Sequence, residues 1–364
     1  MVTNQSLPLY LSDPQLTINV LKIFIIGICS FLVAFFFTPF LTNFLYKHKL
    51  WKKSARDKAI TGEKLNVVSK FHQEDEIKIP RFGGLLVWVV PIIVAFVFLL
   101  FSKTEIPFFK KLNFLSRSQT WLPFFALFWG AIVGLIDDIL QVRGKGKYVG
   151  GGLSVKYRIG AMILIGLVGG FWFYYKLGWS TIHIPGWGDL TIGALYIPLF
   201  VIVMLGTYVG GVIDGLDGLA GGVLSTIFGA YGAIAFFRGQ IDLAAFCAAI
   251  AGAILAFLWF NIPPARFYMG ETGMMGLCAA LTVVAFLSDS VLVLPIIGFL
   301  LVIEALSVLL QVFWKKFFKK KLFLASPIHH HFEAKGWPHY KITMRFWVIS
   351  VICAILGIAI RLLG

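Results

Sequence analysis

The chain has 364 residues, of which 59% are hydrophobic and only 13% are charged. A soluble domain carries about half apolar and about 25% charged residues, so this composition excludes an ordinary soluble domain and indicates a membrane protein. The net charge of +15 does not indicate nucleic-acid binding, because an excess of Lys and Arg in a membrane protein usually marks its cytoplasmic loops. No nucleic-acid partner is expected.

Ten apolar runs approach the length of about 20 residues that a helix needs to cross a bilayer. In chain order the expected spans lie near residues 17–46, 83–101, 121–136, 155–175, 191–209, 219–236, 241–260, 273–287, 291–314 and 343–363. The ninth is long enough to tilt or bend. The sequence therefore predicts an all-α integral membrane protein with about ten transmembrane helices, organised as a single domain over residues 1–364.

Most of the 32 Lys and Arg residues lie in the odd-numbered loops between these runs. Those loops are near residues 47–82, 137–156, 210–218, 261–272 and 315–342. By the positive-inside rule they are cytoplasmic, which places both termini on the extracytoplasmic side. The lysines at 315–321 are expected to anchor the chain to lipid headgroups.

The scarce acidic residues and a histidine triplet fall in the same loops. They are Asp137, Asp138, Asp214, Asp217, Glu271, His329, His330 and His331. Ionisable groups that gather on one side of a membrane protein indicate a shared site.

Each aspartate pair has a plain and a functional interpretation. Asp137 and Asp138 are either a solvated helix end or hard oxygen ligands for a divalent cation beside a pyrophosphate. Asp214 and Asp217 are either part of a polar glycine-rich turn or, at a spacing of three, two carboxylates on one face of a helix start.

The histidine triplet and Glu304 also each have two interpretations. The triplet at 329–331 lacks the i, i+4 spacing of a helical zinc site, so after Pro327 it favours a loop that offers imidazole donors to phosphate oxygens over a surface tract. Glu304 lies inside an apolar run and marks either a paired helix break or the wall of a site. Arg361 is expected to extend from the last span to the membrane boundary.

Several motifs in the chain resemble one known superfamily. They are Asp137-Asp138, Gly152-Leu-Ser-Val-Lys156, Asp214-Gly-Leu-Asp-Gly-Leu-Ala220, Phe260-Asn261, Glu304 with Ser307 and Gln311, and Pro327-Ile-His-His-His-Phe-Glu333. On these residues the chain is similar to the polyprenyl-phosphate N-acetylhexosamine-1-phosphate transferases, and the His-His-His-Phe-Glu block is typical of their peptidoglycan branch, the phospho-N-acetylmuramoyl-pentapeptide transferases.

This resemblance implies an Mg²⁺-dependent enzyme of the bacterial inner (plasma) membrane with a cytoplasmic active site. It implies UDP-MurNAc-pentapeptide as donor, undecaprenyl phosphate as acceptor, and lipid I and UMP as products of a step in peptidoglycan biosynthesis. Membrane lipids are the other expected partners, and the resemblance also allows a homodimer.

Roles for individual residues follow from the resemblance alone. It implies catalytic roles for Asp137, Asp138, Asp217 and His330, and metal binding by Asp138, Asp217 and Glu271. It implies substrate binding by Lys156, Arg158, Asp214, Asn261, Tyr268 (which would stack on uracil), Glu304, His329 and His331.

The chain departs from the family pattern at several positions. Gly211 stands where the family has Asn, Glu271 where it has Asp, Gln141 where it has a Lys soon after the aspartate pair, and Arg158 at another Lys. The family's Thr-Pro-Thr-Met-Gly-Gly reads Ile-Pro-Arg-Phe-Gly-Gly at residues 79–84. Altered nucleotide or sugar contacts are therefore an open interpretation.

Two other functions remain to be separated from this one. The first is a related transferase that moves GlcNAc-1-phosphate for another surface polymer. The second is a lipid or solute transporter, which would be expected to place ionisable residues near the bilayer midplane on broken helices.

Overall fold

The computed structural model describes residues 14–52, 77–146 and 151–364 of the chain. Within these ranges the protein is helical apart from one two-stranded sheet, which confirms the prediction of an all-α multi-pass membrane protein. Most of the basic loop expected near 47–82 lies outside the described residues. The organisation as a single domain stays a prediction.

In the described part of the chain, eight helical segments are long and apolar enough to cross a membrane. They are α1 (Pro14–Lys47), α5 (Trp121–Arg143), α6 (Val155–Phe171) continued by η2 (Trp172–Lys176), α7 (Tyr196–Gly210) between the short turns η3 (Gly193–Leu195) and η4 (Gly211–Ile213), α8 (Leu219–Phe237), α9 (Ile241–Asn261), α10 (Gly270–Leu287) and α14 (His339–Leu363). A further apolar helix, α3 (Leu85–Phe101), has 17 residues. With the bent span described below, each of the ten expected runs is a helix.

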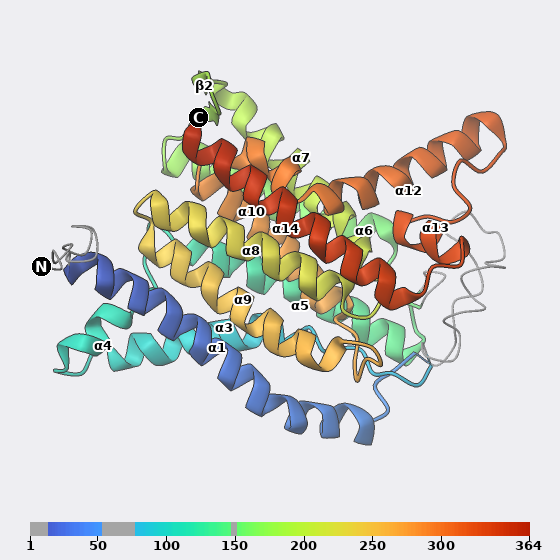
Figure 1. Ribbon diagram of the computed structural model, residues 1–364, viewed down its shortest axis with the longest axis horizontal. Helices are drawn as coiled ribbons and strands as arrows, with labels where there is room; N and C mark the ends of the chain where they lie inside the picture. Colours follow the sequence, from blue (N-terminus) through green and yellow to red (C-terminus); the bar gives the residue numbers. More distant parts are fainter. Residues whose placement is uncertain (1–13, 53–76, 147–150) are drawn as a thin grey trace, which may run out of the picture.

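The helix α10 stands at the centre of the bundle (Figure 1), and nearly all of its residues are buried. It packs most extensively against α5 and also contacts α3, α6 and α7. A helix that is apolar on all sides belongs in such a position. The approach of α5 depends on Gly130 and Gly134, because an added Cβ at Gly134 would overlap the main chain of Glu271. Small residues at helix crossings allow this close packing in membranes.

Gly134→Ala is expected to destabilise the bundle, because the new methyl group would lie 2.7 Å from Cα of Thr272. Backbone atoms cannot move aside as a flexible side chain can, so overpacking of this kind costs about 1–3 kcal/mol. The matched control is Gly160→Ala on α6, where an added Cβ meets nothing within 4 Å. Thermal unfolding in detergent compares the two variants, and equal melting temperatures would contradict the close packing.

The ninth expected span is bent. Its first part is η5 (Val291–Val293) with α11 (Leu294–Ile297), its second part is α12 (Phe299–Phe318), and the two parts meet at Gly298 with an angle of 80°. After Gln311 no residue of α12 is buried. The end of α12 therefore leaves the bundle, as Figure 1 shows at its right side, and carries its terminal lysines with it.

The shorter elements connect the spans. They are α4 (Pro107–Leu112), the antiparallel strands β1 (Thr181–Ile184) and β2 (Gly188–Thr191), and α13 (Ile328–Ala334). The sequence did not predict the hairpin, which lies beside the end of α14 (Figure 1). There Nε2 of His183 is 3.1 Å from the carbonyl oxygen of Gly364.

For Arg361, extension to the membrane boundary stays a prediction. Its side chain is buried and Nε donates to the carbonyl of Asp289 at 3.2 Å and to Oγ of Ser290 at 3.0 Å. The carboxylate of Asp289 lies 3.7 Å from this guanidinium and 3.5 Å from that of Arg238. The turn after α10 therefore offers acceptors to the Arg361 guanidinium, at the end of the bundle that carries the hairpin.

Candidate active site

The adjacent aspartates near the end of α5 are both fully buried. Asp137 accepts a hydrogen bond from the backbone N–H of Leu153 at 2.6 Å. Asp138 accepts one from the backbone N–H of Thr272 at 2.9 Å and lies 3.2 Å from Nε of Arg81. Buried carboxylates require such donors, so both side chains are held in defined orientations between α5 and the start of α10.

Glu271 lies in the first turn of α10, where the helix dipole favours an anion. Its Oε1 is 2.6 Å from Nη1 of Arg158, and Nε of the same guanidinium is 4.0 Å from Oδ1 of Asp137. Arg158 therefore links the start of α10 to the end of α5. Gln141, one helical turn after Asp137, donates its amide to the second oxygen of that aspartate.

The turn between η4 and α8 carries the second aspartate pair. Asp217 accepts a hydrogen bond from the backbone N–H of Ala265 at 3.0 Å, and Asp214 accepts one from the backbone of Gly270. Burial raises the pKa of Asp214 to about 6, and the guanidinium of Arg81 offsets this only in part. The neighbouring carboxylates of Asp138 and Asp217 raise it further, by less than burial does.

Asn261, the last residue of α9, holds this turn in place. Its Oδ1 accepts from the backbone N–H of Gly218 at 2.9 Å, and its Nδ2 donates to the carbonyl of Phe267 at 2.9 Å. Gly218 has a φ of 76°, which glycine adopts without steric strain. The amide of Asn261 is thus engaged within the protein, and its expected contact with substrate stays a prediction.

The histidine triplet lies on the helix α13 and not in a loop as expected. Pro327 precedes the helix and suits a helix start, because its missing N–H would have no partner there. His329 is fully buried, with Nδ1 at 3.0 Å from Oε1 of Glu304 on α12. The second oxygen of Glu304 accepts the backbone N–H of Ile328 at 3.0 Å. Glu304 therefore fixes the position of α13.

The other ring nitrogen of His329, Nε2, points at the aspartate turn. A Cβ added at Gly215, between the two aspartates of that turn, would overlap it. Within the described residues Nε2 has no hydrogen-bond partner, and a buried polar atom without one is unusual in a folded protein. His329 thus brings the histidine motif into contact with the aspartate motif and offers it a nitrogen.

The two following histidines have other neighbours. Nδ1 of His330 is 2.7 Å from Oε2 of Glu333, whose Oε1 is 2.6 Å from Nε2 of His339. Nδ1 of His331 accepts the backbone N–H of Leu324 at 3.1 Å. Burial lowers the pKa of His331, so its ring is neutral at pH 7.

Two predicted substrate-binding residues lie at the margin of this region. The side chain of Lys156 is exposed on the first turn of α6, and the structure does not bring it among the buried ion pairs. Tyr268 is partly exposed. Its N–H donates to the carbonyl of Pro80 and its carbonyl accepts from the N–H of Gly83, both at 2.9 Å.

Comparisons with known proteins agree with this arrangement. Residues 120–289 match the glycosyl transferase family 4 model. A phospho-N-acetylmuramoyl-pentapeptide-transferase of Geobacillus sp. (strain WCH70) is 34% identical over 92% of this chain and 96% of its own length. A protein of the same name from Chlorobaculum parvum is 34% identical over 75% of this chain and 77% of its own length. Another, from Chloroflexus aurantiacus, is 31% identical over 93% of this chain and 89% of its own length.

The chain belongs to the phospho-N-acetylmuramoyl-pentapeptide transferase family. The resemblance inferred from its motifs is confirmed, and as a member of this family it is a membrane phospho-sugar transferase.

Two residues of the acidic region had no role assigned from the sequence. Arg81 was only one of many basic residues in a loop, and Gln141 only a departure from the family's pattern, yet both contact the aspartate pair. The signal for Arg81 was present in its position, two residues before Gly83-Gly84, a motif shared with the family.

Within the described residues, the acidic side chains around α5, α10 and the aspartate turn do not form a closed metal cage. Among the described residues, the set of three whose ligand atoms lie within 4.8 Å of one another is His183, Asp189 and Asp289, at the end of the bundle with the hairpin. The guanidinium of Arg238 lies 3.5 Å from that Asp289, so the set is an ion-pair network. The predicted trio of Asp138, Asp217 and Glu271 is more widely spaced.

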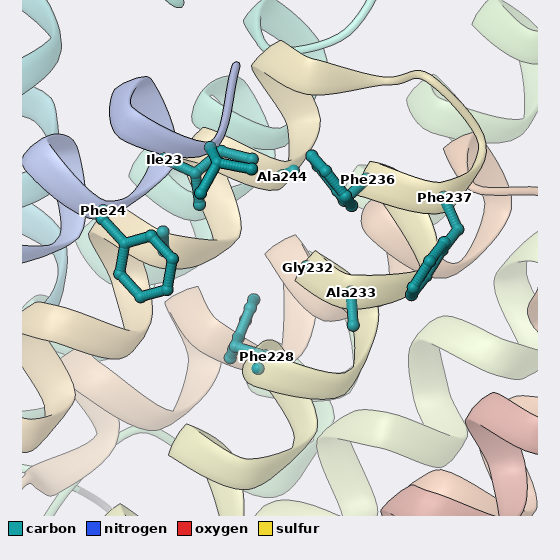
Figure 2. Close-up of a pocket in the computed structure, with 11 residues that line it drawn as sticks. Ile23, Phe24, Phe228, Gly232, Ala233, Phe236, Phe237 and Ala244 are labelled. Carbon is teal, nitrogen blue, oxygen red and sulfur yellow. The ribbon is translucent and has the colours of Figure 1, made fainter. Parts of the chain in front are cut away.

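An apolar hollow of about 230 Å³ lies between α1, α8 and α9 (Figure 2). Phe236 and Phe237, at the end of α8, line it together with Ile23 and Phe24 of α1. The aspartate turn precedes the other end of α8, so the hollow is separate from the candidate active site of this transferase.

Proposed function

We propose that the chain transfers phospho-MurNAc-pentapeptide from UDP-MurNAc-pentapeptide to undecaprenyl phosphate, giving lipid I and UMP in peptidoglycan biosynthesis. The observation that carries the proposal is the meeting of the buried acids of α5 and the partly buried acids of α10 and the turn before α8 with Arg81, Arg158 and His329. The names of relatives that cover nearly the whole chain support the choice of substrates.

The reaction requires two phosphates to approach each other. Cations and hydrogen-bond donors that offset their repulsion, together with positioning, supply most of the catalysis in phosphoryl transfer. In this site Nε2 of His329 faces the turn that carries Asp214 and Asp217 and would contact the donor's diphosphate. Asp137 or Asp138 would accept the proton of the acceptor phosphate and keep it ionised.

A divalent cation such as Mg²⁺ is part of the proposal. The carboxylates of Asp138, Asp217 and Glu271 are hard oxygen ligands, and Mg²⁺ in such sites usually takes one or two carboxylates with waters and substrate phosphates. The wide spacing of the three acids therefore fits this ion, with Asp214 as a further neighbour. When bound, the ion would neutralise charge on the diphosphate.

The proposed site faces the cytoplasm from the bacterial inner membrane. Most basic residues lie in the loops at the end of the bundle that carries α13, which is the cytoplasmic end by the positive-inside rule. α1 begins and α14 ends at the opposite end (Figure 1), so both termini would be extracytoplasmic. A homodimer stays a prediction from the family resemblance.

A panel of donors tests the proposal. The purified protein in nanodiscs, supplied with undecaprenyl phosphate and Mg²⁺, is expected to release UMP from UDP-MurNAc-pentapeptide and not from UDP-GlcNAc. Release from UDP-GlcNAc alone would replace the peptidoglycan assignment with the related transferase for another polymer.

The transporter alternative has less support. Glu304 is the acid that sits within an apolar run, and it is paired with His329 beside the aspartate turn. UMP release that is absent with every donor, together with movement of lipid or solute across a vesicle membrane, would favour transport.

A further inference from the structure

We infer that Arg81 is a positioning residue: its guanidinium holds Asp138 in the orientation seen here, and a cation introduced at position 141, next to Asp137, restores the positive charge that the pair loses when Arg81 is removed. The inference rests on the proposed function. It adds a residue from the loop before α3 to a site otherwise built from α5, α6, α10, α13 and the turn before α8.

Backbone hydrogen bonds hold the main chain of Arg81 and its neighbours in place. Its N–H donates to the carbonyl of Leu50 at 3.0 Å, and the residues on either side pair with the main chain of 268–269, directly before α10. Gly84, three residues later, packs so closely that an added Cβ would overlap the backbone of Gly273. The segment that carries Arg81 is therefore locked against the start of α10.

The side chain of Arg81 completes a clamp on Asp138. Its Nε is 3.2 Å from Oδ1 of Asp138, with the arginine side chain only 17% exposed and the aspartate fully buried. The other oxygen of Asp138 accepts the backbone N–H of Thr272. One donor on each oxygen fixes the plane of the carboxylate, and removal of the charged donor leaves a buried anion without its partner, which is strongly unfavourable.

The second arginine of the region is committed to other acids. Arg158 bridges Glu271 at 2.6 Å and Asp137 at 4.0 Å. Gln141 lies one helical turn after Asp137 and donates to it, but an amide carries no charge. A lysine at position 141 would place an ammonium group beside Asp137, the neighbour in sequence of the aspartate that Arg81 contacts.

Four variants in nanodiscs test the inference: Arg81→Gln, Arg81→Lys, the double variant Arg81→Gln/Gln141→Lys, and Arg143→Gln as matched control. Arg143 is an exposed arginine at the end of α5. Four quantities are measured: kcat and donor KM for UMP release, the Kd of Mn²⁺ from the electron paramagnetic resonance of the free ion, and the melting temperature.

Arg81→Gln is expected to lower kcat by about 100-fold, the effect of losing one electrostatic group from an active site, with a much smaller change in donor KM. Mn²⁺ binding should become about fivefold tighter, because one positive charge leaves a group of acids. Arg81→Lys should retain about a tenth of wild-type kcat, since lysine keeps the charge without the planar fork. The double variant should recover at least about tenfold over Arg81→Gln and restore the wild-type Mn²⁺ Kd.

Retention of at least a third of wild-type kcat by Arg81→Gln would overturn the inference. So would a folded double variant that is no more active than Arg81→Gln. If Arg81→Gln fails to fold, the kcat of Arg81→Lys is the deciding measurement. Complete loss of UMP release in a folded Arg81→Lys would contradict the inference that the positive charge at position 81 is what Asp138 requires. If the wild-type protein releases UMP from no donor, the proposed function fails, while the Mn²⁺ measurements still report whether Arg81 balances the acids.

Discussion

Asp138→Asn is expected to lower kcat for UMP release by roughly 100- to 1,000-fold, the range seen when one electrostatic group is lost from an active site. Asparagine keeps the shape of the side chain and can still accept the N–H of Thr272. It removes the charge that faces Arg81 and the oxygen that a divalent cation would use. The measurement is steady-state UMP release with UDP-MurNAc-pentapeptide and undecaprenyl phosphate, alongside a melting curve to show that the bundle is folded.

Asp189→Asn is the matched control for this variant. Asp189 lies on β2, with a side chain 65% exposed, at the end of the bundle away from α13. A surface change of this kind should leave kcat within about twofold of wild type. Equal rates in Asp138→Asn and wild type would remove the aspartate pair from the mechanism.

His329→Ala is expected to reduce kcat by about 100-fold and to lower the melting temperature. The substitution removes the nitrogen that faces Gly215 and leaves the buried Oε1 of Glu304 without its neighbour. Truncation of a fully buried side chain to alanine leaves a cavity and costs about 2–5 kcal/mol, so the melting temperature should fall measurably. Gly215→Ala should also lower kcat, because the new methyl group would displace the ring of His329 from the aspartate turn.

His48→Ala, at the exposed end of α1 beside Phe44, serves as the histidine control and should change neither quantity. The alternative outcome is also informative. If His330→Ala abolishes UMP release while His329→Ala retains it, the catalytic role belongs to His330, as the sequence comparison with the family assigned it.

The membrane architecture could be predicted because hydropathy is a local property. Each apolar run between charges or turn residues is a helix. The break at Gly298 lies inside the ninth run, which was long enough to bend, whereas the still longer first run is one continuous helix. The hairpin of β1 and β2 escaped prediction, because four-residue strands next to a glycine turn carry little pattern of their own.

The candidate site could be predicted only for those residues whose type is unusual in an apolar chain. Acids and histidines are conspicuous in an apolar chain, and their gathering in the odd loops indicated one site. Arg81 and Gln141 were visible as two unrelated departures from the family's pattern. The contact of Gln141 with Asp137 is local, one turn along α5. That of Arg81 with Asp138 depends on the pairing of the segment before α3 with residues 268–269, a long-range contact with no trace in local sequence.

The orientation of the His329 side chain could not be predicted from the sequence either. Three consecutive histidines on a helix point in three directions, and the packing of α13 against Glu304 decides which of them meets the aspartate turn. Sequence alone could name the triplet but could not rank its members.

Because α10 is enclosed by its neighbours, no side of it meets lipid along most of its length. A bilayer that is thicker or thinner than the bundle acts first on the tilt of helices at its surface, such as α1 and α14, which are mostly exposed. Glu271 and Thr272 stand on the first turn of the enclosed helix and hold their spacing to α5 independently of that tilt. Hydrocarbon thickness should therefore alter how the protein sits in its membrane more than it alters the distances among the acids.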